Sequence, residues 1–387
     1  MKIIEVNNKK LNKEFINFQL KIYKNEKYWV RPLNIDIKNI FDKNKNKTFR
    51  YGDLNRWILI RENKIIGRIA AFYNNKTLNI GNKIPTGGCG FFECINDQNA
   101  ANILFETAKK WLIFNKIEAM DGPINFGERD KWWGCLVKGF SINPNYQQNY
   151  GKKYYKDLFE NYGFQLLFKQ FTYTRNVTSP ISERLYYKTK IAMKNSNYNF
   201  KHIKINNLKK YTNDFKKIYN EAWAKYPGVS KLSSLQAKAI MNQIKPIIDE
   251  KIAWFAYDKE EPVGFFLCIP EMNQIFKHIN GKLNLIGKIK VFFHLKILKS
   301  CKKMVGLVFG IVPTHQGKGL DGALITATRE TIQEKLSYDT LELNWIPDFN
   351  VNMIKVAEQV GVEIAKIHHT YRYNFDKSIP VERIPIK

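Results

Sequence analysis

The chain repeats its own pattern at about half its length. Trp254 follows Trp57 by 197 residues, and Gly264 follows Gly67 by the same interval. A helix-like segment that ends at Gly163 recurs 198 residues later, before Gly361. Unrelated α/β domains can share tryptophan and glycine positions of this kind. Nearly equal intervals between different kinds of motif nevertheless favour a duplication. We therefore predict two domains of one fold, residues 1–195 and 196–387.

Each predicted half contains both strands and helices. The order is a strand hairpin with a glycine turn, a central strand, a helix, a further strand, and a helix that ends in glycine. At 387 residues with 44% hydrophobic and 14% aromatic side chains, the chain is long and apolar enough for two packed cores. The predicted class is therefore α/β, in the α+β sense.

Composition also bears on the compartment and on metals. No stretch approaches the ~20 apolar residues of a membrane span, and the first residues do not form a signal peptide. The five cysteines are odd in number and lack metal-ligand spacing with the six histidines. We expect a cytoplasmic protein with reduced, mostly buried thiols and no metal site.

The second half contains a turn suited to an anion. An apolar segment from Gly306 to Val312 enters a turn with Gly317 and Gly319, and an amphipathic helix follows directly. Backbone N–H groups at a helix N-terminus bind phosphate, and glycine lets the backbone approach it closely. Lys318 adds a cation. A tight turn without any ligand would have the same pattern.

This segment resembles a known cofactor loop. Val312-Pro313 followed by Gln316-Gly317-Lys318-Gly319-Leu320 is similar to the pyrophosphate loop of the GNAT acyltransferases, which bind acetyl-coenzyme A. Gln316 and Gly319 match two fixed positions of that loop, whereas Asp321 stands where the family has a second glycine or alanine. Gly322 follows one residue later.

The resemblance extends along the chain. Asn350 and the helix that ends at Gly361 are similar to the family's Asn-x-x-Ala helix, with Ala357 where many of these enzymes have a tyrosine that protonates the departing thiolate. The whole layout resembles bacterial tandem-GNAT proteins. It implies two tandem domains, each a mixed, mostly antiparallel sheet flanked by helices.

The resemblance also implies an activity. It is acyl-CoA-dependent N-acyl transfer to a small-molecule or peptide amine, with acetyl-CoA or another acyl-CoA as co-substrate. The strand from Leu307 to Val312 would separate from its neighbour and pair with the pantetheine arm. The implied coenzyme-binding residues are Ile311, Val312, Gln316, Gly317, Lys318, Gly319, Leu320, Asp321, Gly322 and Asn350.

Candidate residues exist for both proton-transfer roles, the general base and the general acid. Glu342 alternates with leucines in a predicted strand and is the expected general base, although a solvent-facing glutamate would show the same alternation. Tyr371, or Tyr373 beside it, could replace the missing tyrosine as acid, or either could belong to the core. A backbone N–H at Ile311 or Val312 would stabilise the oxyanion.

The first half lacks the glycine turn. After its central strand, near Phe92, Asp97 is a good N-cap for the helix that follows. We predict that this half has the fold but no nucleotide site. Trp132 and Trp133 lie in a loop rich in charge, which indicates either a recognition surface or an interface between the halves.

The net charge of +28 raises further possibilities. Lysines are spread along the chain, so nucleic acid is a possible partner but not a favoured one. The most local basic segment is 277–303, where lysines alternate with apolar residues. It could lie on an anionic membrane or acidic ligand, cover the acyl site, or be an ordinary solvated helix. Two alternative functions are transfer from aminoacyl-tRNA and ligand binding without catalysis; the oligomeric state is left open.

Overall fold

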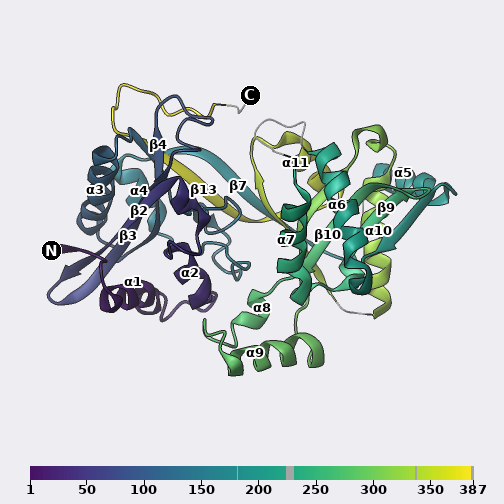
Figure 1. Ribbon diagram of the computed structural model, residues 1–387, viewed down its shortest axis with the longest axis horizontal. Coiled ribbons are helices and arrows are strands. Elements are labelled where there is room, and N and C mark those ends of the chain that lie inside the picture. Colours follow the sequence, from purple (N-terminus) through teal and green to yellow (C-terminus); the bar gives the residue numbers. More distant parts are fainter. Residues whose placement is uncertain (181, 224–230, 336–337, 385–387) are drawn as a thin grey trace.

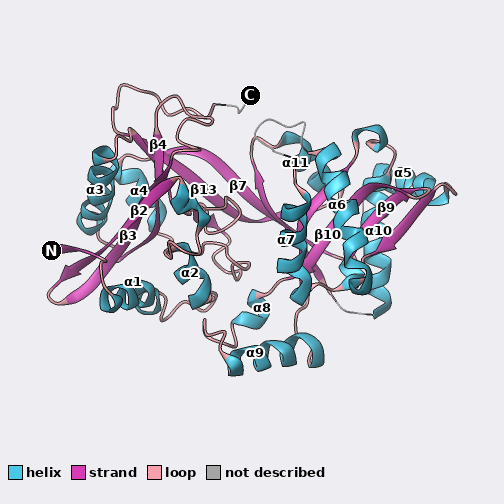
Figure 2. Cartoon of the chain, in the orientation of Figure 1, coloured by secondary structure: helices cyan, strands magenta, loops and turns pink. Residues whose placement is uncertain are grey.

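The computed structural model covers residues 1–387 and describes all of them except 181, 224–230, 336–337 and 385–387. The strands form one mixed sheet in the order β1-β2-β3-β4-β5-β13-β7-β12-β11-β10-β9-β8, with β6 paired to β13. Figures 1 and 2 show this sheet running through the whole molecule, with helices around both ends. The mixed α/β class and the tandem arrangement agree with the prediction.

The first half begins at the N-terminus and ends with β7. Its strands are β1 Lys2–Glu5, β2 Gly52–Arg61, β3 Lys64–Asn74, β4 Thr86–Cys94, β5 Ala119–Gly122, β6 Cys135–Lys138 and β7 Gln165–Asn176. Its helices are α1 Lys9–Ile22, α2 Asn34–Ile40, the 3-10 turn η1 Lys47–Arg50, α3 Gln98–Phe114 and α4 Tyr155–Tyr162.

The second half contains the remaining elements. Its strands are β8 Tyr198–His202, β9 Ala253–Asp258, β10 Glu261–Pro270, β11 Lys303–Ile311, β12 Thr340–Pro347 and β13 Glu363–Asn374. Its helices are α5 Glu183–Lys194, α6 Leu208–Ala222, α7 Ser234–Ile244, α8 Asn273–Phe276, α9 Leu285–Phe292, α10 Leu320–Lys335 and α11 Val351–Gln359. Its shorter turns are η2 Ile205–Asn207, η3 Lys245–Ile247, η4 Glu250–Ile252, the π-helical η5 Phe293–Ile297 and η6 Pro313–His315.

The repeated motifs occupy equivalent places in the two halves. Trp57 and Trp254 lie on the first strands of the hairpins β2–β3 and β9–β10, and Gly67 and Gly264 lie on the second strands. Gly163, directly after α4, has the left-handed conformation that favours glycine (φ +106°). The predicted hairpins and the predicted glycine-terminated helix of the first half are thus present.

The last strand joins the first half to the second. β13 lies between β5 and β7, with Arg372 opposite Asp121 and Ile367 opposite Phe171. β7 in turn pairs with β12, which makes the sheet continuous. The division at residue 195 stays a prediction, and β13 crosses it, because this strand completes the sheet of the first half.

The cores follow the same arrangement. One cluster surrounds Phe255 and Phe265 in the second half, and another surrounds Phe105 and Phe159 in the first. Tyr371 of β13 belongs to the latter cluster. The five cysteines are free and buried, as predicted.

The described part of the chain lacks two kinds of feature. No helix there is both long and apolar enough to cross a membrane. No group of three or more His, Cys, Asp or Glu side chains there is close enough to hold a metal ion.

Candidate functional site

The sheet opens between β11 and β12. These strands pair in parallel only from Lys303 to Gly306, opposite residues 340–343. β12 then continues along β7 with a register shift at Trp345, whose φ is +60°. Leu307, the next residue of β11, is 47% exposed although it lies inside the sheet. β11 therefore separates from its neighbour at Leu307, as the resemblance implied, and one of its edges becomes free.

Backbone N–H groups face this opening. The Val312 N–H donates to the Val263 carbonyl at 2.9 Å, on the β10 side. Because successive residues of an antiparallel strand turn their N–H groups to opposite sides, those of Phe309 and Ile311 face the β12 side. Two residues were predicted to stabilise an oxyanion through a backbone N–H. The N–H of Ile311 points into the opening, whereas the N–H of Val312 is already bonded to Val263.

The glycine turn follows β11 directly. Gly317 and Gly319 have φ of +75° and +83°, which explains why glycine is needed at both positions. The Gln316 side chain donates to the Ile311 carbonyl at 3.0 Å and so braces the turn. Gly317 and Lys318 are exposed, and no atom lies within 4 Å of where a Cβ on Gly317 would be. This side of the turn is open to an anion.

The other side of the turn is covered by α5. A Cβ on Gly319 would lie 2.4 Å from the Lys188 carbonyl oxygen, and one on Gly322 would lie 1.9 Å from Thr189 Oγ1. Gly319, Leu320 and Gly322 are therefore buried by helix packing. The N–H groups of residues 319–322 have no acceptor among the described residues, as expected at the start of a helix. The open part of the predicted loop is limited to residues 316–318, with Asp321 half-buried.

Asn350 caps the helix that follows it. Its side-chain oxygen accepts a hydrogen bond from the Met353 N–H at 3.2 Å, which makes Asn350 the N-cap of α11. A contact with the coenzyme stays a prediction for this residue.

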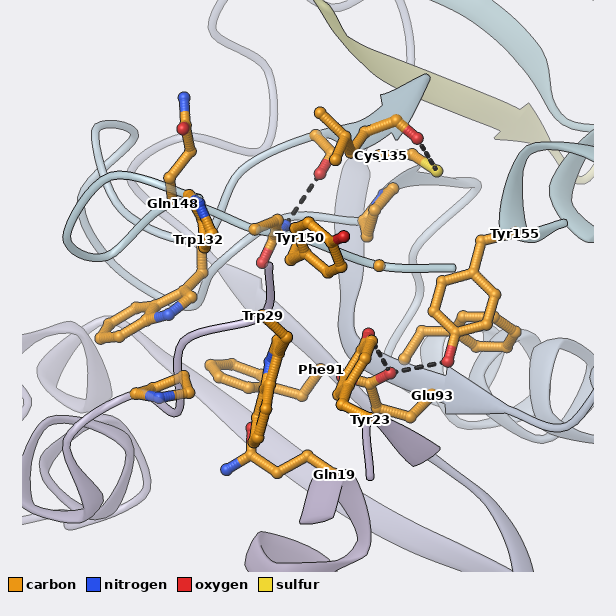
Figure 3. Close-up of a pocket in the computed structure, with 18 of the residues that line it drawn as sticks. Gln19, Tyr23, Trp29, Phe91, Glu93, Trp132, Cys135, Gln148, Tyr150 and Tyr155 are labelled. Carbon is orange, nitrogen blue, oxygen red and sulfur yellow. Dashed lines mark hydrogen bonds between the residues drawn. The ribbon is translucent and has the colours of Figure 1, made fainter. Parts of the chain in front are cut away.

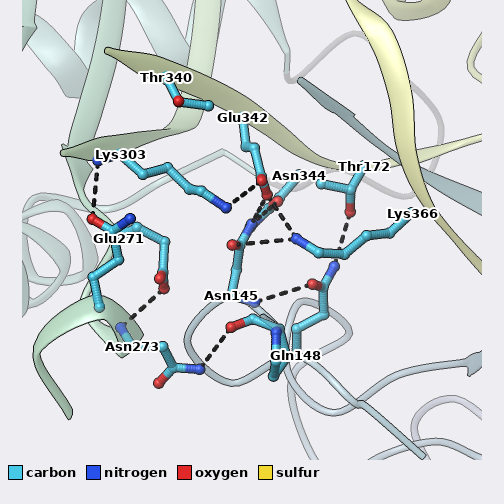
Figure 4. A network of polar contacts seen from close by, with 12 residues as sticks. Asn145, Gln148, Thr172, Glu271, Asn273, Lys303, Thr340, Glu342, Asn344 and Lys366 are labelled. Atoms are coloured by element: carbon cyan, nitrogen blue, oxygen red, sulfur yellow. Dashed lines mark hydrogen bonds and ion pairs between the residues drawn. The ribbon is translucent and has the colours of Figure 1, made fainter. Parts of the chain in front are cut away.

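Glu342 lies in a buried polar network rather than on a free surface (Figure 4). One carboxylate oxygen accepts from Lys366 Nζ at 2.8 Å and from Asn145 Nδ2 at 2.6 Å, and the other pairs with Lys303. The predicted alternative of a solvent-facing glutamate is wrong, because Glu342 is only 2% exposed.

The charges of this network decide the state of Glu342. Burial raises its pKa, but Lys366 and Lys303 together outweigh burial, so the net pKa is lower than usual. Burial likewise lowers the pKa of Lys366, and Glu342 opposes that shift. A carboxylate held between two ammonium groups is ionised and is a weak proton acceptor. Its role as the general base stays a prediction that this geometry does not favour.

The same network joins the two halves. Asn145 also donates to Asn344 at 2.7 Å, and the Tyr146 N–H donates to Glu271 at 2.7 Å. These bonds connect a loop of the first half to β12 and to the end of β10. The network therefore fixes the position of the first half relative to the second at the base of the β11–β12 opening.

Tyr371 lies away from the glycine turn. It is fully buried, stacks on Phe159, and donates its hydroxyl hydrogen to Glu160 at 3.0 Å. Burial raises its pKa well above the ordinary value. Two strands, β7 and β12, separate β13 from β11. The structure therefore places Tyr371, together with Tyr373, in the first-half core and does not bring either to the predicted coenzyme site.

The first half closes the equivalent opening. β4 leaves β5 after Gly88, but the Ile124 N–H then bonds the Cys89 carbonyl at 2.8 Å. Asp97 caps α3 as predicted, accepting from the Ala100 N–H at 3.1 Å, and it also pairs with Arg61 at 2.8 Å. An anion at this helix start would meet a carboxylate that is already bonded.

A cavity of about 70 Å³ lies beside β4 in the first half (Figure 3). Its polar end is Glu93, whose carboxylate accepts from Tyr23 Oη at 2.6 Å and Tyr155 Oη at 2.7 Å. Burial raises the pKa of Glu93, and Arg68 opposes that shift. Aromatic rings, including Trp29 and Tyr150, form much of the remaining wall.

Several buried donors line this cavity without a partner among the described residues. They are Gln19 Nε2, Arg68 Nε and Trp132 Nε1. A narrow aromatic space with free donors and one carboxylate suits part of an amphipathic molecule with hydroxyl or carbonyl groups. Trp132, predicted for recognition or for an interface, lines this cavity. Glu93 was not among the predicted site residues, although a glutamate directly after Gly90-Phe91-Phe92 indicates a buried charge.

Two curated proteins resemble this chain over nearly its whole length. No family model matches the chain. It is 23% identical over 362 residues to a bacterial ceramide synthase of Caulobacter vibrioides, covering 93% of this chain and 94% of that protein. It is 24% identical over 375 residues to protein YghO of Escherichia coli, covering 94% and 93%.

Solved structures define the fold. A tandem GNAT protein from the clavulanic acid biosynthesis pathway superposes with a TM-score of 0.55 over 98% of this chain and all of that one, at 9% identity. The chain has the tandem GNAT fold. A GNAT region of a fungal multi-domain β-N-acetylglucosaminidase matches with the same TM-score over 96% of this chain and 38% of that one, at 10% identity.

Proposed function

We propose that this tandem GNAT protein transfers an acyl group from acyl-CoA to an amine. The observation that carries the proposal is the free edge of β11, which leads straight into the exposed glycine turn. A free strand edge can pair with the amide groups of a pantetheine arm, and a helix N-terminus can hold a pyrophosphate. The two features lie in the order in which these groups occur along coenzyme A.

Each group of the site has a defined task in this proposal. Residues 307–311 bind the pantetheine arm through their free backbone groups, and Gln316 to Lys318 hold the pyrophosphate. The amine nitrogen attacks the thioester carbonyl carbon. As negative charge develops on the carbonyl oxygen, that oxygen accepts a hydrogen bond from the Ile311 N–H. The carbon–nitrogen bond forms, the carbon–sulfur bond breaks, and the proton lost by the amine leaves with the thiol.

The acceptor is proposed from the relatives. The Caulobacter relative is named a ceramide synthase, and ceramide is the amide of a fatty acid with a long-chain amino alcohol. We infer that this chain also acylates an amino alcohol with a long alkyl chain and that its donor is a fatty acyl-CoA. Acetyl-CoA, expected from the resemblance alone, is the donor to compare with it.

Purified protein is tested by following release of the CoA thiol from acetyl-CoA and from a long-chain acyl-CoA, with and without a long-chain amino alcohol. Lys318→Glu places a carboxylate beside the proposed pyrophosphate and should raise the KM for acyl-CoA at least about tenfold, or ~1.4 kcal/mol. Lys45→Glu makes the same charge reversal at an exposed site in the first half and should leave the KM unchanged.

The alternatives predict other outcomes. Equal KM values for the two variants would reject the coenzyme site, even if thiol is released. No thiol release with either donor would reject acyl-CoA as the co-substrate, and aminoacyl-tRNA or a binding role without catalysis would then be tested.

A further inference from the structure

The segment formed by α9 and η5 carries a large apolar surface. Figure 1 shows α9 at the lower edge of the molecule, below α8. Large apolar side chains of this segment, and of Leu298 directly after it, are between 47% and 75% exposed: Leu285, Ile286, Ile289, Phe292, Phe293, Ile297 and Leu298. Isolated exposed apolar residues are normal, but a contiguous group of this size on one short segment marks an interaction surface.

The segment is held in place from its other side. Val291 and Leu295 pack against the second-half core, and the Gly281 carbonyl, just before α9, accepts from the Asn34 N–H at 2.9 Å. The exposed side chains are therefore presented outward by an anchored helix.

Charge is arranged around this surface. At 100° per residue, Leu285, Ile286, Ile289, Phe292 and Phe293 fall within an arc of about 120°. Lys288 and Lys290 fall at the two edges of that arc, and both are exposed. An apolar face with lysines at its rims is typical of a helix that lies in the interface of a bilayer.

The sequence around this segment is uniformly basic. The sequence contains no acidic residue between Glu271 and Asp321. Within the described residues, Lys288, Lys290, Lys296 and Lys299 form no salt bridge. A second copy of this surface would bring these like charges together, whereas anionic lipid headgroups would neutralise them.

We propose that α9 and η5 dock the protein onto the surface of an anionic lipid bilayer, with the apolar side chains inserted among the lipids and the lysines at the headgroups. The proposal does not depend on the acyltransferase activity. Its failure would leave the proposed function intact, and loss of the activity would leave the docking intact.

The test is co-sedimentation of the full chain with vesicles of phosphatidylcholine alone or with added phosphatidylglycerol. The wild type should sediment with the anionic vesicles and much less with the neutral ones. The variant Ile286→Ser/Ile289→Ser/Phe292→Ser should bind at least about tenfold more weakly. The control Ile113→Ser/Phe114→Ser/Ile191→Ser removes three other exposed apolar side chains, which lie outside this segment, and should bind as the wild type does.

A label provides a measurement that does not depend on the triple variant. Phe292→Cys places an exposed thiol on the surface, whereas the five native cysteines are buried. An environment-sensitive dye at this position should shift to shorter emission wavelength on anionic vesicles, and the same dye at Phe114→Cys should not.

Three results would overturn the proposal. They are equal sedimentation of the triple variant and the wild type, no shift at position 292, and a wild-type dimer that the triple variant abolishes without any binding to vesicles. The last result would assign the surface to a second copy of the chain.

Discussion

At the scale of single residues, burial between two lysines gives the Glu342 carboxylate a structural role. Of its two partners, Lys366 is buried beside it and Lys303 is partly exposed. Removing one member of a buried ion pair leaves the other charges unpaired, and this costs more than the pair itself contributes. We therefore expect Glu342 to stabilise the folded protein.

We expect Glu342→Gln to lower the free energy of unfolding by about 3 kcal/mol. Because the folded-state pKa of Glu342 is depressed, its contribution should be present above the unfolded pKa of about 4.3 and be lost as pH falls through the lower folded value. Urea unfolding at several pH values measures both effects.

The control at this scale is Glu118→Gln, because Glu118 is exposed and forms no salt bridge with the described residues. It should change stability by less than about 0.5 kcal/mol. A Glu342→Gln protein that is as stable as the wild type but has lost kcat would instead support the general base.

At the scale of elements, the contact between α5 and the first turn of α10 determines how much a side chain at Gly317 or Gly319 would destabilise the protein. Gly317→Ala adds only the strain of a left-handed residue, about 1 kcal/mol, because its Cβ enters open space. Gly319→Ala adds the same strain and a Cβ 2.4 Å from the Lys188 carbonyl oxygen. We expect Gly319→Ala to cost about 2 kcal/mol more than Gly317→Ala in urea unfolding. Equal costs would mean that α5 does not lie across the turn in solution.

At the scale of the whole molecule, the position of β13 makes the first half dependent on the C-terminus. The end of β7 and the start of β13 lie side by side, with Thr174 opposite Glu363. We expect residues 1–195 alone not to unfold cooperatively, because β5 and β7 lack the strand between them. Residues 1–177 joined by a short glycine turn to 362–384 should show a cooperative thermal transition by circular dichroism. Cooperative folding of 1–195 by itself would contradict this expectation.

Local features of this protein could be predicted from its sequence. The repeated hairpins, the Asp97 cap and the glycine turn agree with the structure. Each depends on periodicity, capping or backbone conformation within a few consecutive residues, and these are properties that a sequence pattern contains directly.

Only the tertiary structure decided which distant segments meet. Asn145 contacts Glu342 from 197 residues away, α5 covers Gly319, and Tyr371 enters the first-half core through β13. Strand order and helix docking are set by the packing of whole faces, and no local pattern states which face meets which. The sequence alone determined two α/β halves and an anion-suited turn, whereas the shared sheet and its buried charges depend on contacts between residues far apart in the chain.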